Sequence, residues 1–217
     1  MIGGTMLADY LVNAFATLFV TIDPVGLAPM FLAVTAGATP AVRKRVAIRA
    51  VLIGGGILFL FLVAGKNLLG ALGISVPAFQ IAGGLLLLMI AVEMVFEKRN
   101  RRKSETAEKA VAHHDDLHDV AVFPLAIPLI AGPAAISAVI LLSSQAPDTI
   151  SVLGLASVIG VIVATCYLSF LLADRIERLL GDTAAMVITR LLGVLLAALS
   201  VQFIADGVIA LIAAANA

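Results

Sequence analysis

The chain has 217 residues, of which 62% are hydrophobic and 13% charged, and its formal net charge at pH 7 is zero. A soluble domain of this length cannot bury so much apolar surface, so the composition excludes a soluble protein and predicts one that crosses a membrane several times. Cys166 is the only cysteine, which excludes an intrachain disulfide, and no motif or basic patch for binding nucleic acid is present.

Six apolar stretches are long enough to cross a bilayer as helices. The expected fold class is therefore an all-α polytopic membrane protein with six transmembrane helices. Residues 1–20 contain neither Lys nor Arg, so no removable signal peptide is expected. Prolines fall near the middle of the first and fourth spans, which we expect to be broken. The expected spans are residues 7–36, 46–64, 76–96, 120–142, 150–173 and 187–212.

The basic residues lie almost entirely on one side of these spans. The first, third and fifth connections and their flanks hold every one of the 14 Lys and Arg residues except Lys66. Because connections rich in Lys and Arg remain in the cytoplasm, we expect these three connections there. Both termini are then expected on the outer side of the membrane.

The third connection, residues 98–119, is the only substantial polar segment, and it separates residues 1–97 from residues 120–217. It holds His113, His114 and His118 among several aspartates. Such a cluster is typical of a divalent-cation site. We favour a solvated linker, because a mobile segment does not fix ligand geometry. No metal site and no cofactor are predicted.

The two halves resemble each other at a constant offset of 109 residues. Each half has three spans, an odd number, so the second half enters the membrane from the opposite side. The expected architecture is a 3+3 inverted-topology repeat, which is typical of secondary transporters. The alternative is chance similarity between apolar segments. The matches are Pro24 with Pro133, Lys66 with Arg175, Gly84 with Gly193, and Val92-Glu93 with Val201-Gln202.

Each expected break contains a helix-start signal. Asp23-Pro24 offers an N-cap followed by a proline at the first helical position, and Gly132-Pro133 repeats this order. A broken helix within a bilayer is tolerated where it is buried in protein or lines a wet cavity. Because the halves are inverted, both half-helices are expected to direct their positive, amide-bearing ends at one central region.

The two breaks differ in charge, and this difference suggests a zwitterionic substrate. Its ammonium group would meet Asp23, and its carboxylate would take the N–H groups of Ala134 and Ala135. The alternative is that Asp23 only caps its own helix and that the prolines only bend theirs. The surrounding residues are small, which favours glycine or alanine. The expected substrate-binding residues are Asp23, Pro24, Val25, Gly26, Ala131, Gly132, Pro133, Ala134, Ala135 and Ser137.

Four polar residues are candidates for coupling transport to H⁺ or Na⁺: Asp23, Glu93, Gln202 and Asp206. Glu93 and Gln202 occupy equivalent positions of the repeat and are expected to face the core. Snorkelling of Glu93 to the cytoplasmic surface is the alternative for that residue.

Motifs in three spans resemble those of the MarC family of integral membrane proteins, and the resemblance covers essentially the whole chain. It implies a six-span protein of the bacterial inner membrane, related to the LysE-type exporters. Some members are described as transporters of neutral amino acids such as glycine and alanine. The histidine-bearing connection is not part of the resemblance. The motifs are Asp23-Pro24-Val25-Gly26 with Pro29, Pro128-Leu129-Ile130-Ala131-Gly132-Pro133, and Val201-Gln202-Phe203 with Asp206-Gly207.

The expected function is a secondary transporter of small neutral amino acids or related small metabolites, bound at the midplane between two broken helices. An enzyme is not expected, because the chain has neither an HExxH motif nor a Ser/His pair in its spans. The remaining alternative is a non-transporting membrane protein of stress response or assembly, which predicts a dry, filled centre. The expected partners are the small substrate and the lipid bilayer, and a homo-oligomer is left open.

Overall fold

The structure is a computed structural model that describes residues 2–96 and 120–215. Within these two ranges every regular element is helical and no strand occurs. Five described helices are long and apolar enough to cross a membrane, and one bent pair raises the number to six. The elements are α1 (Ile2–Ile22), α2 (Pro24–Val34), α3 (Pro40–Ala71), α4 (Val76–Val95), η1 (Ala121–Ile130), α7 (Pro133–Gln145), α8 (Thr149–Leu171) and α9 (Ala173–Ala215).

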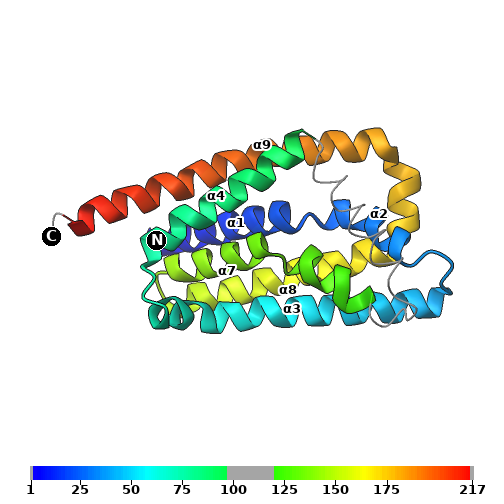
Figure 1. Ribbon diagram of the computed structural model, residues 1–217, viewed down its shortest axis with the longest axis horizontal. Coiled ribbons are helices and arrows are strands. Elements are labelled where there is room, and N and C mark those ends of the chain that lie inside the picture. Colours follow the sequence, from blue (N-terminus) through cyan, green and yellow to red (C-terminus); the bar gives the residue numbers. More distant parts are fainter. Residues whose placement is uncertain (1, 97–119, 216–217) are drawn as a thin grey trace.

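The helices run alternately in opposite directions along the long axis of the molecule (Figure 1). α1 and α2 together run one way, while η1 and α7 together run the other way. The helix pair with the most extensive contact is α4 with α9. A Cβ on Gly84 of α4 would lie 3.0 Å from the carbonyl oxygen of Ser200, and one on Gly193 of α9 would lie 3.1 Å from that of Ala91. These glycines let the two backbones approach closely, as small residues do between membrane helices.

α1 and α2 meet at Asp23, where a proline begins the second helix. α1 ends at Ile22, and Pro24 is the first residue of α2. A proline in this first position costs the helix no hydrogen bond, because an N–H group there would have no partner within the helix. Together the two helices form one candidate span, Leu7–Val34.

η1 is an irregular helical segment, and its prolines explain why. Phe123 and Ile127 have extended backbone angles, with φ of −128° and −127°. Each precedes a proline, and the ring of a proline disfavours helical angles at the residue before it. η1 ends with a wide turn, in which the Ala131 N–H donates to the Ala126 carbonyl five residues back. η1 and α7 are bent by 51° at the break between them.

A buried apolar core runs through the molecule beneath a surface that is itself apolar. One cluster of buried residues draws members from every described element. Large apolar side chains are also exposed along the outside, for example Val63 and Met89. Apolar exposure over so much of a surface is expected where lipid, rather than water, covers the protein.

The fifth connection differs from its prediction. The sixth span was expected to begin at residue 187, but α9 begins at Ala173 and continues to Ala215. Only Leu172 separates it from α8. In Figure 1, α9 turns at one end of the molecule before it runs back along α4. The third connection, with its histidines, lies outside the described residues.

Candidate functional site: the starts of α2 and α7

Asp23 caps α2 from an unusual backbone conformation. Its φ and ψ are 59° and 67°, in the left-handed region. Few residues other than glycine adopt these angles, and Asp is among those that do so most readily. Oδ1 of Asp23 accepts a 3.0 Å hydrogen bond from the Gly26 N–H, and its carbonyl oxygen accepts one of 3.1 Å from Leu27. The carboxylate is thereby held over the first turn of α2, with the residue only 1% exposed.

Gly26 is required by this cap. A Cβ at position 26 would collide with the Asp23 carboxylate, which folds back over the first turn. The N–H of residue 26 also has to reach Oδ1. The sequence Asp-Pro-Val-Gly is therefore one local unit, in which Asp supplies the cap and Gly supplies the space for it.

α7 begins in the same way but without a charged cap. Gly132 occupies the N-cap position, Pro133 the first helical position, and no described side chain caps the helix. The N–H groups of Ala134 and Ala135 belong to the first turn, where the helix itself supplies no acceptor. Both residues are buried, whereas Pro133 is exposed. Two amide donors and the positive end of a helix dipole therefore lie in the protein interior.

The residues beside the two breaks belong to one core cluster. Their side chains are small or of moderate size. The members of the cluster next to the breaks are Ile22, Leu27, Ala28, Ala131, Ala134 and Ala135.

Pro29 adds an acceptor near Asp23. It lies inside α2 and has no N–H, so the carbonyl of Val25 lacks its α-helical donor. Val25 is half-buried and Pro24 is buried. The start of α2 thus carries a carboxylate and a carbonyl acceptor, while the start of α7 carries N–H donors.

The remaining predicted site residues lie elsewhere. Ser137 is buried on α7 and faces α4, where a Cβ on Gly83 would lie 3.8 Å from its own Cβ. Gln202 was expected to face the core, and this is wrong: it is exposed, and its Nε2 donates a 2.7 Å hydrogen bond to Asp206. Glu93 is half-buried near the end of α4. The structure therefore brings neither Gln202 nor Asp206 to the starts of α2 and α7.

A pocket that the sequence did not predict lies near the far end of α2. Its lining residues come from four helices, α2, α3, α8 and α9. The sequence of any one of these segments alone does not indicate a pocket. Arg43 and Lys44 were interpreted only as signals of orientation. The lining residues are Phe31, Pro40, Arg43, Lys44, Phe170, Leu171 and Asp174.

Comparison with known proteins places the chain among integral membrane proteins. A family model described as "MarC family integral membrane protein" matches residues 8–212. A UPF0056 membrane protein of Archaeoglobus fulgidus is 37% identical over 194 residues, covering 89% of this chain and 90% of that protein. The UPF0056 membrane protein YhcE of Escherichia coli is 35% identical over 194 residues, covering 89% of each chain. YvbG of Bacillus subtilis, also a UPF0056 membrane protein, is 33% identical over 208 residues, covering 93% of this chain and 95% of its own. No solved structure matches.

Proposed function

Because the chain belongs to the MarC family of integral membrane proteins, we propose that it is a secondary transporter of small neutral amino acids resembling glycine and alanine. The observation that carries this proposal is the pair of helix starts. Asp23 presents a carboxylate at the start of α2, while Ala134 and Ala135 present uncapped N–H groups at the start of α7. An α-amino acid needs both, one for its ammonium group and one for its carboxylate.

The proposal includes an inverted repeat with an offset of 109 residues, and helix starts support it. The N-caps Asp23 of α2 and Gly132 of α7 are separated by this offset, and so are the N-caps Thr39 of α3 and Asp148 of α8. α1–α2 and η1–α7 also run in opposite directions in Figure 1. Inverted repeats of this kind commonly hold substrate at their interface, between half-helix ends.

Contacts between α4 and α9 support the same repeat. Gly84 lies against Ser200 and Ile204, and Gly193 lies against Ala91 and Val95. Adding 109 to each number of the α4 residues in these contacts gives the α9 residues: 84 becomes 193, 91 becomes 200, and 95 becomes 204. Each half therefore makes, at this interface, the contact that the other half makes.

The small side chains beside the two breaks favour small substrates. The side chains next to the two breaks include Gly26, Ala28, Ala131 and Ala134, all of them buried. We assign no coupling role to Gln202 or Asp206, and Asp23 is the proposed coupling residue if H⁺ or Na⁺ moves with the substrate.

We further propose that both termini lie outside the cytoplasm of a bacterial inner membrane. The ends of helices that carry Arg43, Lys44 and Asp174 are then cytoplasmic, in keeping with the distribution of basic residues. Fusions of alkaline phosphatase and of green fluorescent protein to residue 217 test this orientation. An active phosphatase and a dark fluorescent fusion are expected, and the reverse pattern would invert the proposed topology.

A non-transporting role in stress response or assembly is the competing function, and close burial around Asp23 favours it. A cysteine in place of Ala134 separates the two functions. In a transporter it should react with a small, water-soluble thiol reagent and be protected by substrate, whereas a dry centre keeps it unreactive. Ala134 is a better position than Gly132, because a Cβ on residue 132 would collide with the Pro128 carbonyl oxygen.

The direct experiment is uptake of labelled glycine and alanine into proteoliposomes that contain wild type or Asp23→Asn. Saturable uptake by the wild type and its loss in Asp23→Asn are expected. Equal, non-saturable leakage in both would overturn the transport function. Saturable uptake that survives in Asp23→Asn would remove the ammonium role of Asp23 and leave transport standing.

A further inference from the structure

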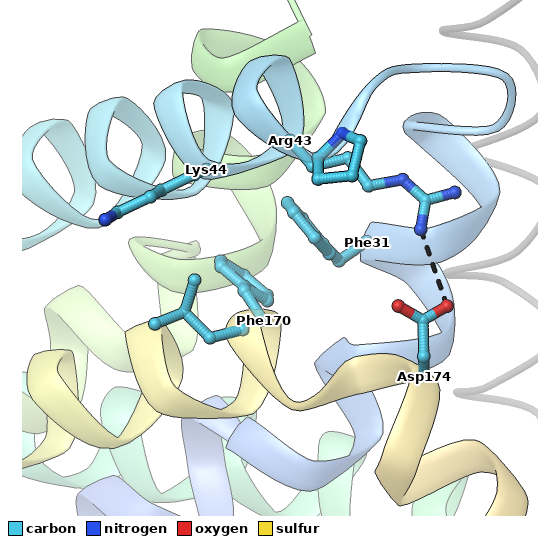
Figure 2. Close-up of a pocket in the computed structure, with 7 residues that line it drawn as sticks. Phe31, Arg43, Lys44, Phe170 and Asp174 are labelled. Carbon is cyan, nitrogen blue, oxygen red and sulfur yellow. Dashed lines mark hydrogen bonds and ion pairs between the residues drawn. The ribbon is translucent and has the colours of Figure 1, made fainter.

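The pocket near the far end of α2 is a cavity of about 220 Å³ with charged walls and an aromatic floor (Figure 2). Arg43 and Lys44 come from the first two turns of α3, and Asp174 comes from the first turn of α9. In Figure 2, Phe31 of α2 and Phe170 of α8 lie between Lys44 on one side and Arg43 and Asp174 on the other. Cations and a carboxylate around one cavity give it both of the charges that a zwitterion requires.

The floor of this pocket is an aromatic stack. The rings of Phe31 and Phe170 have their centroids 4.6 Å apart and their planes 14° apart. Both residues are almost fully buried. Asp23, Leu27 and Phe31 are spaced four residues apart on α2, so they follow one face of that helix. The face that begins at the proposed binding carboxylate therefore ends at the floor of the pocket.

Arg43 ties the end of α2 to the start of α9. Its Nε donates a 3.3 Å hydrogen bond to the carbonyl oxygen of Thr35, the C-cap of α2. Its Nη1 lies 3.4 Å from Oδ1 of Asp174, as Figure 2 shows. One side chain of α3 thus connects three helices around the mouth of the pocket. Without the ion pair, the Arg43 side chain would be positioned at the end of α2 by its hydrogen bond to Thr35 alone.

The opposite end of the molecule is closed in a different way. A Cβ on Gly65 of α3 would lie 2.7 Å from Cγ1 of Ile140 on α7, so there is no free space between α3 and α7 at this point. Ser143 Oγ of α7 donates a 3.2 Å hydrogen bond to the Leu62 carbonyl of α3, and Tyr10 donates one of 2.9 Å to the Leu142 carbonyl. Close packing and backbone hydrogen bonds hold α7 there, whereas the end of α2 is held by the Phe31–Phe170 stack and by the hydrogen bond from Arg43 to Thr35.

We propose that the pocket is the cytoplasmic vestibule of the transport path and that Phe31–Phe170 and Arg43–Asp174 form its gate. A small zwitterionic amino acid enters the vestibule, where Arg43, Lys44 and Asp174 meet its two charges. Separation of the stack then opens the face of α2 that leads past Leu27 to Asp23. This inference rests on the proposed transport function and adds the access route and the residues that close it.

Accessibility of a cysteine beneath the stack tests the gate without any transport assay. Leu27→Cys is placed between Phe31 and Asp23. The native Cys166 is buried, and its labelling in the same variants without Leu27→Cys is the background. A charged, membrane-impermeant methanethiosulfonate reagent is applied to either face of oriented membrane vesicles. With the gate intact, slow labelling is expected from both faces. Adding Phe170→Ala should raise the labelling rate from the cytoplasmic face at least about tenfold, because it increases a minor open state.

Asp174→Asn is the second gate variant, and Phe15→Ala, which removes a stacked ring at an exposed position, is the control. Asp174 is largely exposed, so its substitution opens the ion pair without removing core volume. Phe15 stacks on Phe19 with centroids 5.5 Å apart, far from the pocket in sequence, and its loss should leave labelling of Leu27→Cys unchanged. Monodisperse elution from a sizing column confirms that each variant is folded.

The outcomes separate the gate from the transport function. Unchanged labelling in both gate variants, or an equal rise with Phe15→Ala, would overturn the gate, even if glycine uptake is measured in the wild type. Faster labelling in the gate variants, from the cytoplasmic face alone, supports the gate. If that result accompanies an absence of uptake, the gate stands and the proposed substrate fails.

Discussion

The carboxylate of Asp23 occupies the space that a side chain on Gly26 would need. The two residues are also joined by the hydrogen bond from the Gly26 N–H to Oδ1 of Asp23. The start of α2 therefore depends on both residues, and replacing either one should destabilise it.

Gly26→Ala is expected to lower the stability of the folded protein by about 1–3 kcal/mol, because the new Cβ displaces the cap and crowds the first turn. Gly56→Ala is the control, since nothing lies within 4 Å of a Cβ built there. The control should be neutral or stabilising by up to about 1 kcal/mol, as expected for Gly to Ala in a helix. Reactivity of the buried Cys166 thiol during heating in detergent measures both. Equal melting of Gly26→Ala and wild type would contradict this account of the cap.

Asp23→Asn and Asp23→Ala should separate the charge of Asp23 from its capping role. Asn accepts the same hydrogen bond and adopts the left-handed conformation readily, so a loss below about 0.5 kcal/mol is expected. Ala loses the cap and is strained at positive φ, which together cost about 2 kcal/mol. The same thermal assay compares them. An Asn variant as unstable as the Ala variant would show that Asp23 stabilises the protein through its charge.

The glycines of the α4–α9 interface predict matched effects. Gly84→Ala and Gly193→Ala should each destabilise the protein by about 1–3 kcal/mol, because each new Cβ meets a backbone carbonyl of the other helix. Equivalent positions in a repeat should give values within about 1 kcal/mol of each other. Gly160→Ala on α8, where a Cβ meets nothing within 4 Å, serves as the control. A large effect at one glycine and none at the other would argue against the 109-residue equivalence.

Asp148 predicts a pH dependence at the start of α8. Hydrogen bonds from the Ser151 backbone N–H and then the Ser151 hydroxyl hold the pKa of Asp148 below its ordinary value of 3.8. A carboxyl whose pKa is lowered by folding stabilises the protein fully when the pH is above its unfolded pKa of 3.8. This contribution is lost as the pH falls through the lower pKa of the folded state. Wild type should therefore lose more stability between pH 6 and pH 3 than Asp148→Asn, whose amide can still cap α8. Circular dichroism during heating at the two pH values tests this, and identical losses would refute it.

Local sequence signals predicted the features that depend on local chemistry. The membrane class and the MarC family are confirmed. α2 and α7 begin at Pro24 and Pro133, the residues at which an N-cap followed by proline indicated a helix start. The cap chemistry and the missing N–H of proline act within one turn, so the sequence alone contains them.

Features that depend on distant contacts could not be predicted in the same way. Gln202 was expected to face the core, but the buried face of α9 passes through Ser200 and Phe203. One residue along a helix is a rotation of about 100°, so an error of one position turns a buried side chain outward. The pocket near the far end of α2 was missed because Phe31, Arg43 and Asp174 come together only when three helices pack.

The close contacts of Gly84 and Gly193 also determine which parts of the molecule can move. Two helices whose backbones touch have no layer of adjustable side chains between them at the contact. We therefore expect α4 and α9 to move as one rigid unit. In the proposed transport cycle, rearrangement would then be left to the short half-helices α2 and α7. An antibody fragment that grips only α4 and α9 should bind every conformation equally and leave the rate of turnover untouched.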